Sequence, residues 1–494
     1  MIARFTSDTV ARLAKAARVL LLGLVIVHGA AAANGPDGAP RSSADAKLAA
    51  ELTAWPGDFS RPEAYEGHAG GAGTSFHAPT RNAFSHPAQN LAPSQRTRFR
   101  VGDAIFRKLW VTAPASTAAS DGLGPLFNAR SCQRCHRKDG RGRPPLNEDD
   151  RGGTLLLALT HPDGADPVYG RQLQTHAVPG IPAEGKISIT HRMIPVAGQP
   201  DLELRSPQYG ALNLSWGPLD PRTGLSPRVA PPMIGLGLLE AIPDADILAH
   251  ADPDDADDDG ISGRPSWVAA EAGGAPVLGR FGWKAAVPTV RMQAAKAFFE
   301  DIGIGSGLFP GSAGACTEVQ AECRNAPGGD HNDDGIEIPA RLFDQVVFYS
   351  RNLAVPARRD PDNPDILAGK RIFFDSGCAD CHVPKFVTQR TADRPEHSFQ
   401  LIWPYTDLLL HDMGEELADT GADPLRREWR TPPLWGIGLT ETVSGTFRLL
   451  HDGRADGLME AILWHGGEAA ASRDRVVQLS EEEQERLLEF LRSL

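Results

Sequence analysis

The sequence is poor in cysteine, has no excess of basic residues and contains no long apolar run beyond its first 33 residues. Its formal net charge is −13, and a strongly acidic surface argues against nucleic acid and anionic lipid as partners. An apolar run of about 20 residues is needed to cross a bilayer, so we expect no membrane-spanning helix. Because only 6 of the 494 residues are cysteine, their positions are informative.

The first 33 residues have the order of a secretory signal. Four basic residues are followed by the apolar run of residues 19–27 and then by three alanines that end at Ala33. The apolar run is too short to span a membrane. We therefore predict a signal peptide over residues 1–33, cleaved near Ala33, and a soluble, exported mature protein.

Four of the six cysteines stand in two copies of the pattern Cys-x-x-Cys-His. Two thiols at this spacing can each add to one vinyl group of a porphyrin, and the adjacent imidazole can then ligate the iron. The pattern predicts two covalently bound haem c groups. Since c-type haem is attached outside the bacterial cytoplasm, the motifs and the signal together predict a periplasmic location. The two copies are Cys132, Cys135, His136 and Cys378, Cys381, His382.

The cysteines allow other uses. A thioredoxin-like dithiol, or a zinc site with ligands from both pairs, would also contain closely spaced thiols. Neither requires a histidine directly after the second cysteine in both copies, which favours haem. Cys316 and Cys323 flank a short polar loop, and in an oxidising compartment we predict a disulfide between them, with two free thiols as the alternative.

The apolar pattern around each motif is typical of cytochrome c. We predict short helices before the motifs, at residues 101–110 and 366–374, and amphipathic helices after them, at residues 341–353 and 480–494, the last with a capping box. The predicted fold is mainly α, with two tandem cytochrome c-like domains, the first carrying a large loop-rich insertion with a few short strands. The predicted segments are residues 34–95 (an extended N-terminal arm or linker), 96–355 (the N-terminal cytochrome c-like domain, haem 1) and 356–494 (the C-terminal one, haem 2).

Two acidic loops within the insertion have alternating oxygen-bearing side chains followed by glycine. This pattern is typical of calcium loops, although neither loop has glutamate at the twelfth position of an EF-hand. A solvated acidic turn is the alternative for each. The candidate calcium ligands are Asp255, Asp257 and Asp259 in one loop and Asp330, Asn332 and Asp334 in the other.

Longer stretches resemble one group of proteins. Residues 429–469 (WRTPPLWGIGLTETVSGTFRLLHDGRADGLMEAILWHGGEA) are similar to the C-terminal signature of bacterial di-haem cytochrome c peroxidases and of the relative that matures the methylamine-dehydrogenase cofactor. The resemblance extends from about Arg96 to the C-terminus. Four more stretches resemble the di-haem oxidoreductases described as peroxidases and, in older descriptions, as thiol oxidoreductases: DGLGPLFNARSCQRCHRKDGRGRPP, SPRVAPPMIGLGLLEAI, GRFGWKAAVPTVRMQAAKAFFEDIGI and PYTDLLLHDMGEELAD.

The resemblance implies two haems with different tasks. In the peroxidase relatives the N-terminal haem reacts with peroxide, while the six-coordinate C-terminal haem receives electrons and passes them on. His136 and His382 would be the proximal iron ligands, and His465 would be the sixth ligand of the second haem, with Met413 and Met459 as alternatives. A bis-histidine iron has a lower potential than a His/Met iron, so His465 would make the second haem a stronger reductant. A histidine at a surface helix end is the other interpretation of His465.

The same resemblance implies residues that act at the first haem. Glu300 is the first choice for the group that moves a proton between the two peroxide oxygens, and Asp301 is the second. Two adjacent carboxylates are also typical of a solvated helix end. Trp283 matches a tryptophan between the haems of the relatives, although it would equally suit a core. The further candidates are His161, Tyr169 and His176 as a resting-state ligand of the first iron, and His411, His451 and Arg454 beside the second haem.

These observations predict a periplasmic di-haem c-type oxidoreductase that reduces hydrogen peroxide, or a similar small oxidant, at the N-terminal haem with electrons relayed from the C-terminal haem. The expected electron donor is a soluble protein of the cytochrome c or cupredoxin type. Two alternatives remain: a non-catalytic di-haem electron carrier, and an oxidase that directs high-valent haem at a protein or organic substrate. A thiol oxidoreductase is disfavoured because the four motif thiols would be consumed as thioethers.

Overall fold

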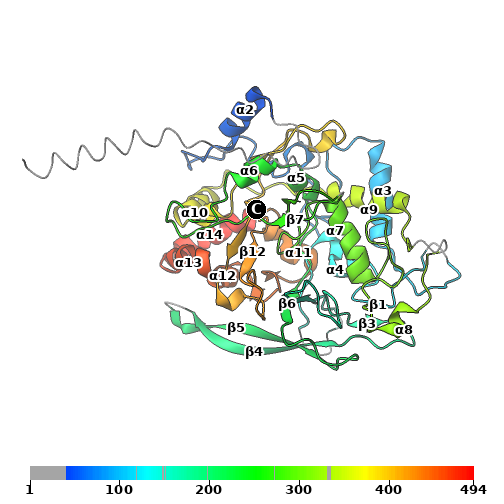
Figure 1. Ribbon diagram of the computed structural model, residues 1–494. Helices are drawn as coiled ribbons and strands as arrows, with labels where there is room; N and C mark the ends of the chain where they lie inside the picture. The colour runs from blue at the N-terminus through cyan, green and yellow to red at the C-terminus, as the bar shows by residue number, and fades with distance from the viewer. Residues whose placement is uncertain are drawn as a thin grey trace, which may run out of the picture.

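The part of the chain that the computed structural model describes comprises residues 41–117, 120–146, 150, 152–196, 199–271, 273–330 and 335–494 (Figure 1). The predicted signal peptide lies outside these residues, as do Asn332 and Asp334. Within them, no helix has both the length and the apolar character that a membrane span requires.

A pair of helices brackets the first cysteine motif in the sequence. Helix α3 (Gln95–Phe106) packs against α9 (Ala340–Arg351), and Phe99 and Phe106 join the buried aromatic and aliphatic residues of α9 in one cluster. The two backbones approach at Gly102, where a Cβ atom would lie 2.2 Å from the carbonyl oxygen of Gln345. A glycine is therefore required at this crossing.

A second pair brackets the other motif. Helix α10 (Pro364–Asp375) packs against the C-terminal helix α14 (Glu481–Ser493), and again a glycine stands at the crossing, since a Cβ atom on Gly369 would lie 1.9 Å from the carbonyl oxygen of Arg486. The predicted capping box of Ser480 and Glu483 at the start of α14 is confirmed. Both predicted amphipathic helices are thus present.

The strands form two-stranded antiparallel sheets throughout the described residues. The longest is the hairpin of β4 (Lys186–Val196) and β5 (Gln199–Leu212), which lies along one edge of the molecule in Figure 1. The sequence predicts a few short strands in this insertion, whereas the strands of this hairpin are longer, with 11 and 14 residues. The other strands are β1 (Leu126–Phe127), β2 (Leu156–Thr160), β3 (His176–Ala177), β6 (Gly224–Arg228), β7 (Trp267–Val268), β8 (Val277–Leu278), β9 (Phe386–Val387), β10 (Leu401–Ile402), β11 (Leu410–Asp412), β12 (Glu428–Arg430), β13 (Arg448–Leu449) and β14 (Ala455–Asp456).

The prediction of a mainly α fold built from two tandem cytochrome c-like domains is wrong. The helices are short and lie between many small sheets and irregular segments, so the described residues form a mixed α and β structure. The physical reason is that glycine- and proline-rich stretches around the motifs form hairpins and turns instead of continuing the helices. The remaining α-helices are α2 (Ser43–Thr53), α4 (Cys132–Cys135), α5 (Leu236–Glu240), α6 (Asp244–Leu248), α7 (Val290–Ala297), α8 (Ala321–Arg324), α11 (Thr440–Ser444), α12 (Leu458–Leu463) and α13 (Ala470–Val477).

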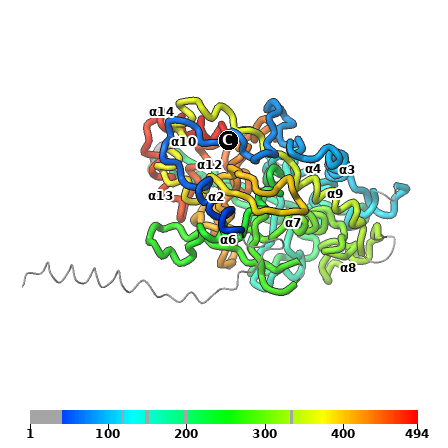
Figure 2. Tube along the Cα trace, turned by 90° about the horizontal axis from the view of Figure 1, so that it is seen from above, coloured from blue at the N-terminus to red at the C-terminus, as the bar shows by residue number. Residues whose placement is uncertain are grey.

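The described residues of the predicted N-terminal arm pack against the body of the molecule. Figure 2 shows α2 beside α6, where the Arg41 guanidinium lies 2.7 Å from the Asp246 carboxylate. Further along, Glu66 is 1 % exposed, and its carboxylate lies 2.9 Å from Nζ of Lys370, a buried residue of α10. The arm thus contacts the helix that leads into the second motif. The boundaries of the predicted segments stay a prediction.

Candidate functional site

The second cysteine motif borders a large cavity. Helix α10 ends before Gly377, whose positive φ of 81° turns the chain into the 3₁₀ turn Cys378–Asp380. Cys378, Cys381 and His382 line a cavity of ≈ 1530 Å³, open solvent at its mouth included. Most of its other lining residues are apolar, and this lining, two thiols and an imidazole suit a covalently attached porphyrin.

The imidazole of His382 is held in one orientation. Its Nδ1 lies 3.0 Å from the carbonyl oxygen of Tyr405, which fixes this nitrogen as the donor and leaves Nε2 with its lone pair. Burial lowers the pKa of His382 to about 4, so the ring is neutral at physiological pH. A neutral, oriented imidazole is what an iron ligand requires.

His465 lines the same cavity and follows α12 in the chain. Its Nδ1 lies 2.7 Å from the carbonyl oxygen of Ala461, which again leaves Nε2 free, and burial lowers its pKa. A positive charge on His465 would lower the pKa of His382, so the two imidazoles are close enough to interact electrostatically. Met413 also lines the cavity, whereas Met459 packs against the neighbouring apolar core and is not in the lining. The structure therefore brings His382 and His465 together.

The three other residues predicted near this haem differ in their surroundings. His411 lines the cavity, but its Nε2 lies 2.7 Å from Asp407 and its Nδ1 2.8 Å from Glu468. Burial opposes a charge on the ring, yet the two carboxylates raise the pKa of His411 well above its ordinary value. Both of its nitrogens are thus engaged by carboxylates and are not available to a cofactor while these contacts persist.

His451 lines the cavity with its ring stacked on Trp429 at a centroid distance of 3.7 Å, and burial lowers its pKa to about 3. Arg454 does not line this cavity. Its guanidinium binds the Asp452 carboxylate at 2.9 Å instead. Of the two, the structure places only His451 in the cavity.

The first motif repeats the arrangement of the second. Cys132 and Cys135 stand in α4, and Nδ1 of His136 lies 2.9 Å from the carbonyl oxygen of Pro231. Burial lowers the pKa of His136 to about 4. The two motifs therefore offer the same group, a buried neutral imidazole whose Nδ1 is bonded to a backbone carbonyl.

One segment contacts both sites. While Pro231 accepts the hydrogen bond of His136, the adjacent Pro232 lines the second cavity. Trp283 lines that cavity too and donates from its indole nitrogen to the carbonyl oxygen of Val229 at 2.8 Å. The guanidinium of Arg141, five residues after His136, lies 5.4 Å from the centre of the Trp283 ring. Trp283 therefore lines the cavity of the second motif and also contacts the segment that orients His136.

Glu300 and Asp301 occupy a π-helical turn, Phe298–Ile302, which follows α7. Burial raises the pKa of Asp301 to about 7. Burial is the main reason that the pKa of the Cys132 and Cys135 thiols is raised to about 12, and the negative charge on Asp301 is the next. The Asp301 carboxylate therefore lies near the first motif. Burial also raises the pKa of Glu300, whose carboxylate lies 3.8 Å from Lys296.

Sequence reasoning missed the side chains that hold this turn. The Gln172 amide donates to the Asp301 carboxylate at 2.8 Å, and the Gln174 amide donates to the backbone oxygen of Glu300 at 2.8 Å. The Gln174 backbone nitrogen donates to the Glu184 carboxylate at 2.5 Å. Gln172 and Gln174 belong to no recognisable sequence motif, so only the fold could reveal this hydrogen-bond network.

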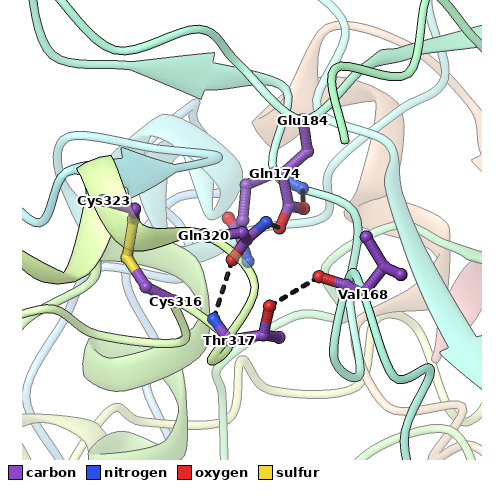
Figure 3. The surroundings of a disulfide bond; sticks show 7 residues. All are labelled: Val168, Gln174, Glu184, Cys316, Thr317, Gln320 and Cys323. Carbon is purple, nitrogen blue, oxygen red and sulfur yellow. Dashed lines mark hydrogen bonds between the residues drawn. A yellow bond between two sulfur atoms is a disulfide. The ribbon is translucent and has the colours of Figure 1, made fainter. Parts of the chain in front are cut away.

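The predicted disulfide is formed between Cys316 and Cys323, and it adjoins that network (Figure 3). The Gln320 amide, three residues before Cys323, donates to the Glu184 carboxylate at 2.6 Å. Burial raises the pKa of Glu184 to about 7. Hydrogen bonds thus run from the disulfide loop to the π-helical turn.

The three residues considered as resting ligands of the first iron are spread out. Tyr169 donates its hydroxyl to the carbonyl oxygen of Gly217 at 2.6 Å, and His161 lies 3.6 Å from the Asp220 carboxylate. His176 stacks on Phe127 at 5.6 Å, and its pKa is lowered by burial and by the charge of Arg134, a residue of the first motif. Only His176 is thus linked to that motif.

The first acidic loop contains a cluster of carboxylates. Ligand atoms of Asp252, Asp255 and Asp257 lie within 4.8 Å of one another, whereas the Asp259 carboxylate accepts a hydrogen bond from the backbone of Ile261. In the second loop the Asp330 carboxylate accepts from the backbone of Gly335 at 3.0 Å. Calcium at either loop stays a prediction.

Comparisons with known proteins place the chain in a family. The family model described as "Di-haem oxidoreductase, putative peroxidase" matches residues 65–155 and 199–494, which include both cysteine motifs. No curated protein matches the chain. A solved chain of hydrazine synthase from Kuenenia stuttgartiensis is 20% identical with a TM-score of 0.21, and the match covers 32% of this chain and 56% of that chain, about half of its length.

Proposed function

The chain belongs to the family of di-haem oxidoreductases, and from this premise we propose that it carries two haem c groups and reduces hydrogen peroxide at the first, with electrons from the second. The observation that carries the proposal is the cavity that His382, His465 and the two thiols of the second motif line together. When bound, haem supplies the iron that cleaves the O–O bond and exchanges electrons.

At the second site, Cys378 and Cys381 would form the thioethers and His382 would be the proximal ligand. His465 fits the sixth position better than Met413 because its Nδ1 is held by a backbone carbonyl, which orients Nε2. At the first site, Cys132, Cys135 and His136 would play the corresponding roles.

Asp301 is a better candidate than Glu300 for the residue that transfers a proton at the first site. It lies near the motif cysteines, and with a pKa of about 7 its carboxyl group can both accept and release a proton near neutral pH. Gln172 donates to one carboxylate oxygen, which fixes the orientation of the group. The carboxylate of Glu300 lies beside Lys296, and its role would be limited to changing the electrostatic surroundings of Asp301.

Trp283 suits an intermediate position in electron transfer between the sites. Its indole lines the second cavity, and its N–H bonds Val229, two residues before the carbonyl that orients His136. These contacts support a role for the aromatic ring between the two sites. The donor of the electrons would be a soluble cytochrome c or cupredoxin, and the location periplasmic.

A non-catalytic electron carrier is the second candidate. It is favoured by His176, whose side chain lies close enough to the first motif for Arg134 to affect its pKa. A firm bond from His176 to the first iron would leave no position for peroxide.

Electron paramagnetic resonance of the purified mature protein, before and after peroxide is added, separates the two. A peroxidase gives one high-spin and one low-spin haem signal, and peroxide changes the high-spin signal. Two low-spin signals that peroxide leaves unchanged would instead identify a carrier and contradict our proposal. Mass spectrometry of the same sample must show two porphyrins covalently bound to the polypeptide.

A further inference from the structure

A second, smaller pocket lies next to the haem cavity. It measures ≈ 540 Å³, open solvent at its mouth included, and is bordered by the β4–β5 hairpin, by residues 144–146 and by the segment that contains β13 and Arg454. It shares no lining residue with the large cavity. A ligand here would therefore not occupy the haem site.

The walls of the small pocket carry positive charge. His191 and Arg205 come from the hairpin, and Arg448 and Arg454 come from the opposite side. Burial lowers the pKa of His191, and the charges of Arg205 and Arg448 lower it further, so these groups are close enough to interact. The three arginines make this pocket positively charged in a chain with a net charge of −13, whereas the lowered pKa of His191 disfavours a charge on its ring.

Carboxylates nearby do not neutralise all of these cations. Arg454 is bound to Asp452, which is fully buried and also accepts the Tyr209 hydroxyl at 2.8 Å. Arg448 lies 3.3 Å from Asp456, a pair open to solvent on the Asp456 side. For the side chains of Arg205 and His191, the described residues provide neither an ion pair nor a hydrogen bond.

We propose that this pocket binds a small oxyanion. The planar guanidinium groups of Arg205 and Arg448 can each donate two parallel hydrogen bonds to a phosphate or a carboxylate. Phosphate and carboxylate both offer negatively charged oxygens as acceptors. Haem propionates are not needed to explain the pocket, because the haem cavity has its own arginines in Arg141, Arg430 and Arg473. Of the lining residues, Ile189 and His191 lie in residues 156–198, which the family match leaves out, whereas Arg205 and Arg448 lie in matched residues.

Isothermal titration calorimetry of the mature holoprotein tests the proposal, with inorganic phosphate and succinate as titrants at constant ionic strength in chloride. Arg205→Gln and Arg448→Gln should each weaken binding of the preferred anion at least about tenfold, the effect expected when a charge-assisted hydrogen-bonded pair is lost. Arg192→Gln is the matched control, since Arg192 is an exposed arginine of the same hairpin, 2.6 Å from Glu416 and outside the pocket. It should change affinity less than twofold.

If phosphate binds more tightly than succinate, the ligand is a phosphate; if succinate binds more tightly, it is a carboxylate. The proposal is overturned if neither anion binds the wild-type protein, or if Arg192→Gln weakens binding as much as Arg205→Gln does. Unchanged haem absorption and unfolding temperature show that a variant is folded. If Arg448→Gln does not fold, Arg205→Gln alone decides the outcome, because the Arg205 side chain is exposed and makes no hydrogen bond or ion pair with the described residues.

Discussion

At the scale of single residues, the main result is that backbone carbonyls orient the histidines. Pro231 holds His136, Tyr405 holds His382, and Ala461 holds His465, in each case through Nδ1. Nε2 is thereby the nitrogen available to a metal, and burial keeps each ring neutral. By contrast His411 has both nitrogens engaged by carboxylates.

The first prediction concerns His465. His465→Ala should convert the second haem from low-spin to high-spin, because the sixth position loses its imidazole. Electron paramagnetic resonance measures this change, and Met413→Leu should leave the low-spin signal in place. A low-spin signal that survives His465→Ala but is lost in Met413→Leu would identify the methionine as the ligand.

The second prediction concerns Asp301. Asp301→Asn keeps the size of the side chain but removes its ability to carry a proton, so kcat for peroxide reduction should fall about 10²- to 10⁴-fold. The haem absorption spectrum should not change. Asp344→Asn is the control, since this exposed carboxylate of α9 pairs with Arg291. Equal losses in both variants would argue against a catalytic role for Asp301.

At the scale of elements, close crossings and one short turn position the motifs. The helix pairs α3–α9 and α10–α14 each approach through a glycine. The π-helical turn Phe298–Ile302 is held by Gln172 and Gln174, which approach from outside it. Turns of this kind are frequent at functional sites because they move a side chain out of the helical register.

The third prediction tests the α10–α14 crossing. Gly369→Ala places a methyl group 1.9 Å from the Arg486 carbonyl oxygen, so the helices must separate. We expect a loss of about 1–3 kcal/mol in the free energy of unfolding, measured by denaturant titration of the holoprotein. Arg371→Ala on the exposed face of α10 should cost much less. Equal stability of the two variants would show that the helices adjust freely.

The fourth prediction tests the hydrogen bond between Gln172 and Asp301 in the π-helical turn. Gln172→Leu removes a hydrogen bond that favours ionised Asp301 and so raises the pKa of Asp301. If ionised Asp301 accepts the proton from peroxide, the acid limb of the pH–rate profile should move up by about 1–2 pH units. Gln208→Leu, on the exposed part of β5, should leave the profile in place. A lower kcat without a shift would mean that Gln172 has only a structural role.

At the scale of the whole molecule, buried polar contacts connect distant segments. The residues around Pro231 lie between the two motifs, and the Cys316–Cys323 loop reaches the π-helical turn through Gln320, Glu184 and Gln174. Such a network is stable only while every buried polar group keeps its partner.

The fifth prediction concerns the pH dependence of stability. Burial raises the pKa of Glu184 from 4.5 to about 7, so in that window the folded protein binds a proton that the unfolded chain has released. This contribution to stability is complete below pH 4.5, declines as the pH rises and is gone above about pH 7. Glu184→Gln should flatten the fall in unfolding temperature across the window, and Glu203→Gln, an exposed control on β5, should not.

The sequence by itself determined the local features of this protein. Cys-x-x-Cys-His, the disulfide cysteines and the capping box of α14 each depend on residues close together in the chain, and local spacing also located α9 and α10. The helix before the first motif was predicted at residues 101–110 but extends over Gln95–Phe106, because apolar spacing marks a helix better than its ends.

Tertiary structure decided the rest. Which distant segments meet decides the mixed fold and the closeness of Asp301 to the first motif. It also decides the position of Arg454 outside the cavity of the second motif and the hydrogen bonds of Gln172 and Gln174. Burial is set by the whole fold, and it determines which carboxyl group titrates near neutral pH. Apolar spacing along one segment contains no information about that environment.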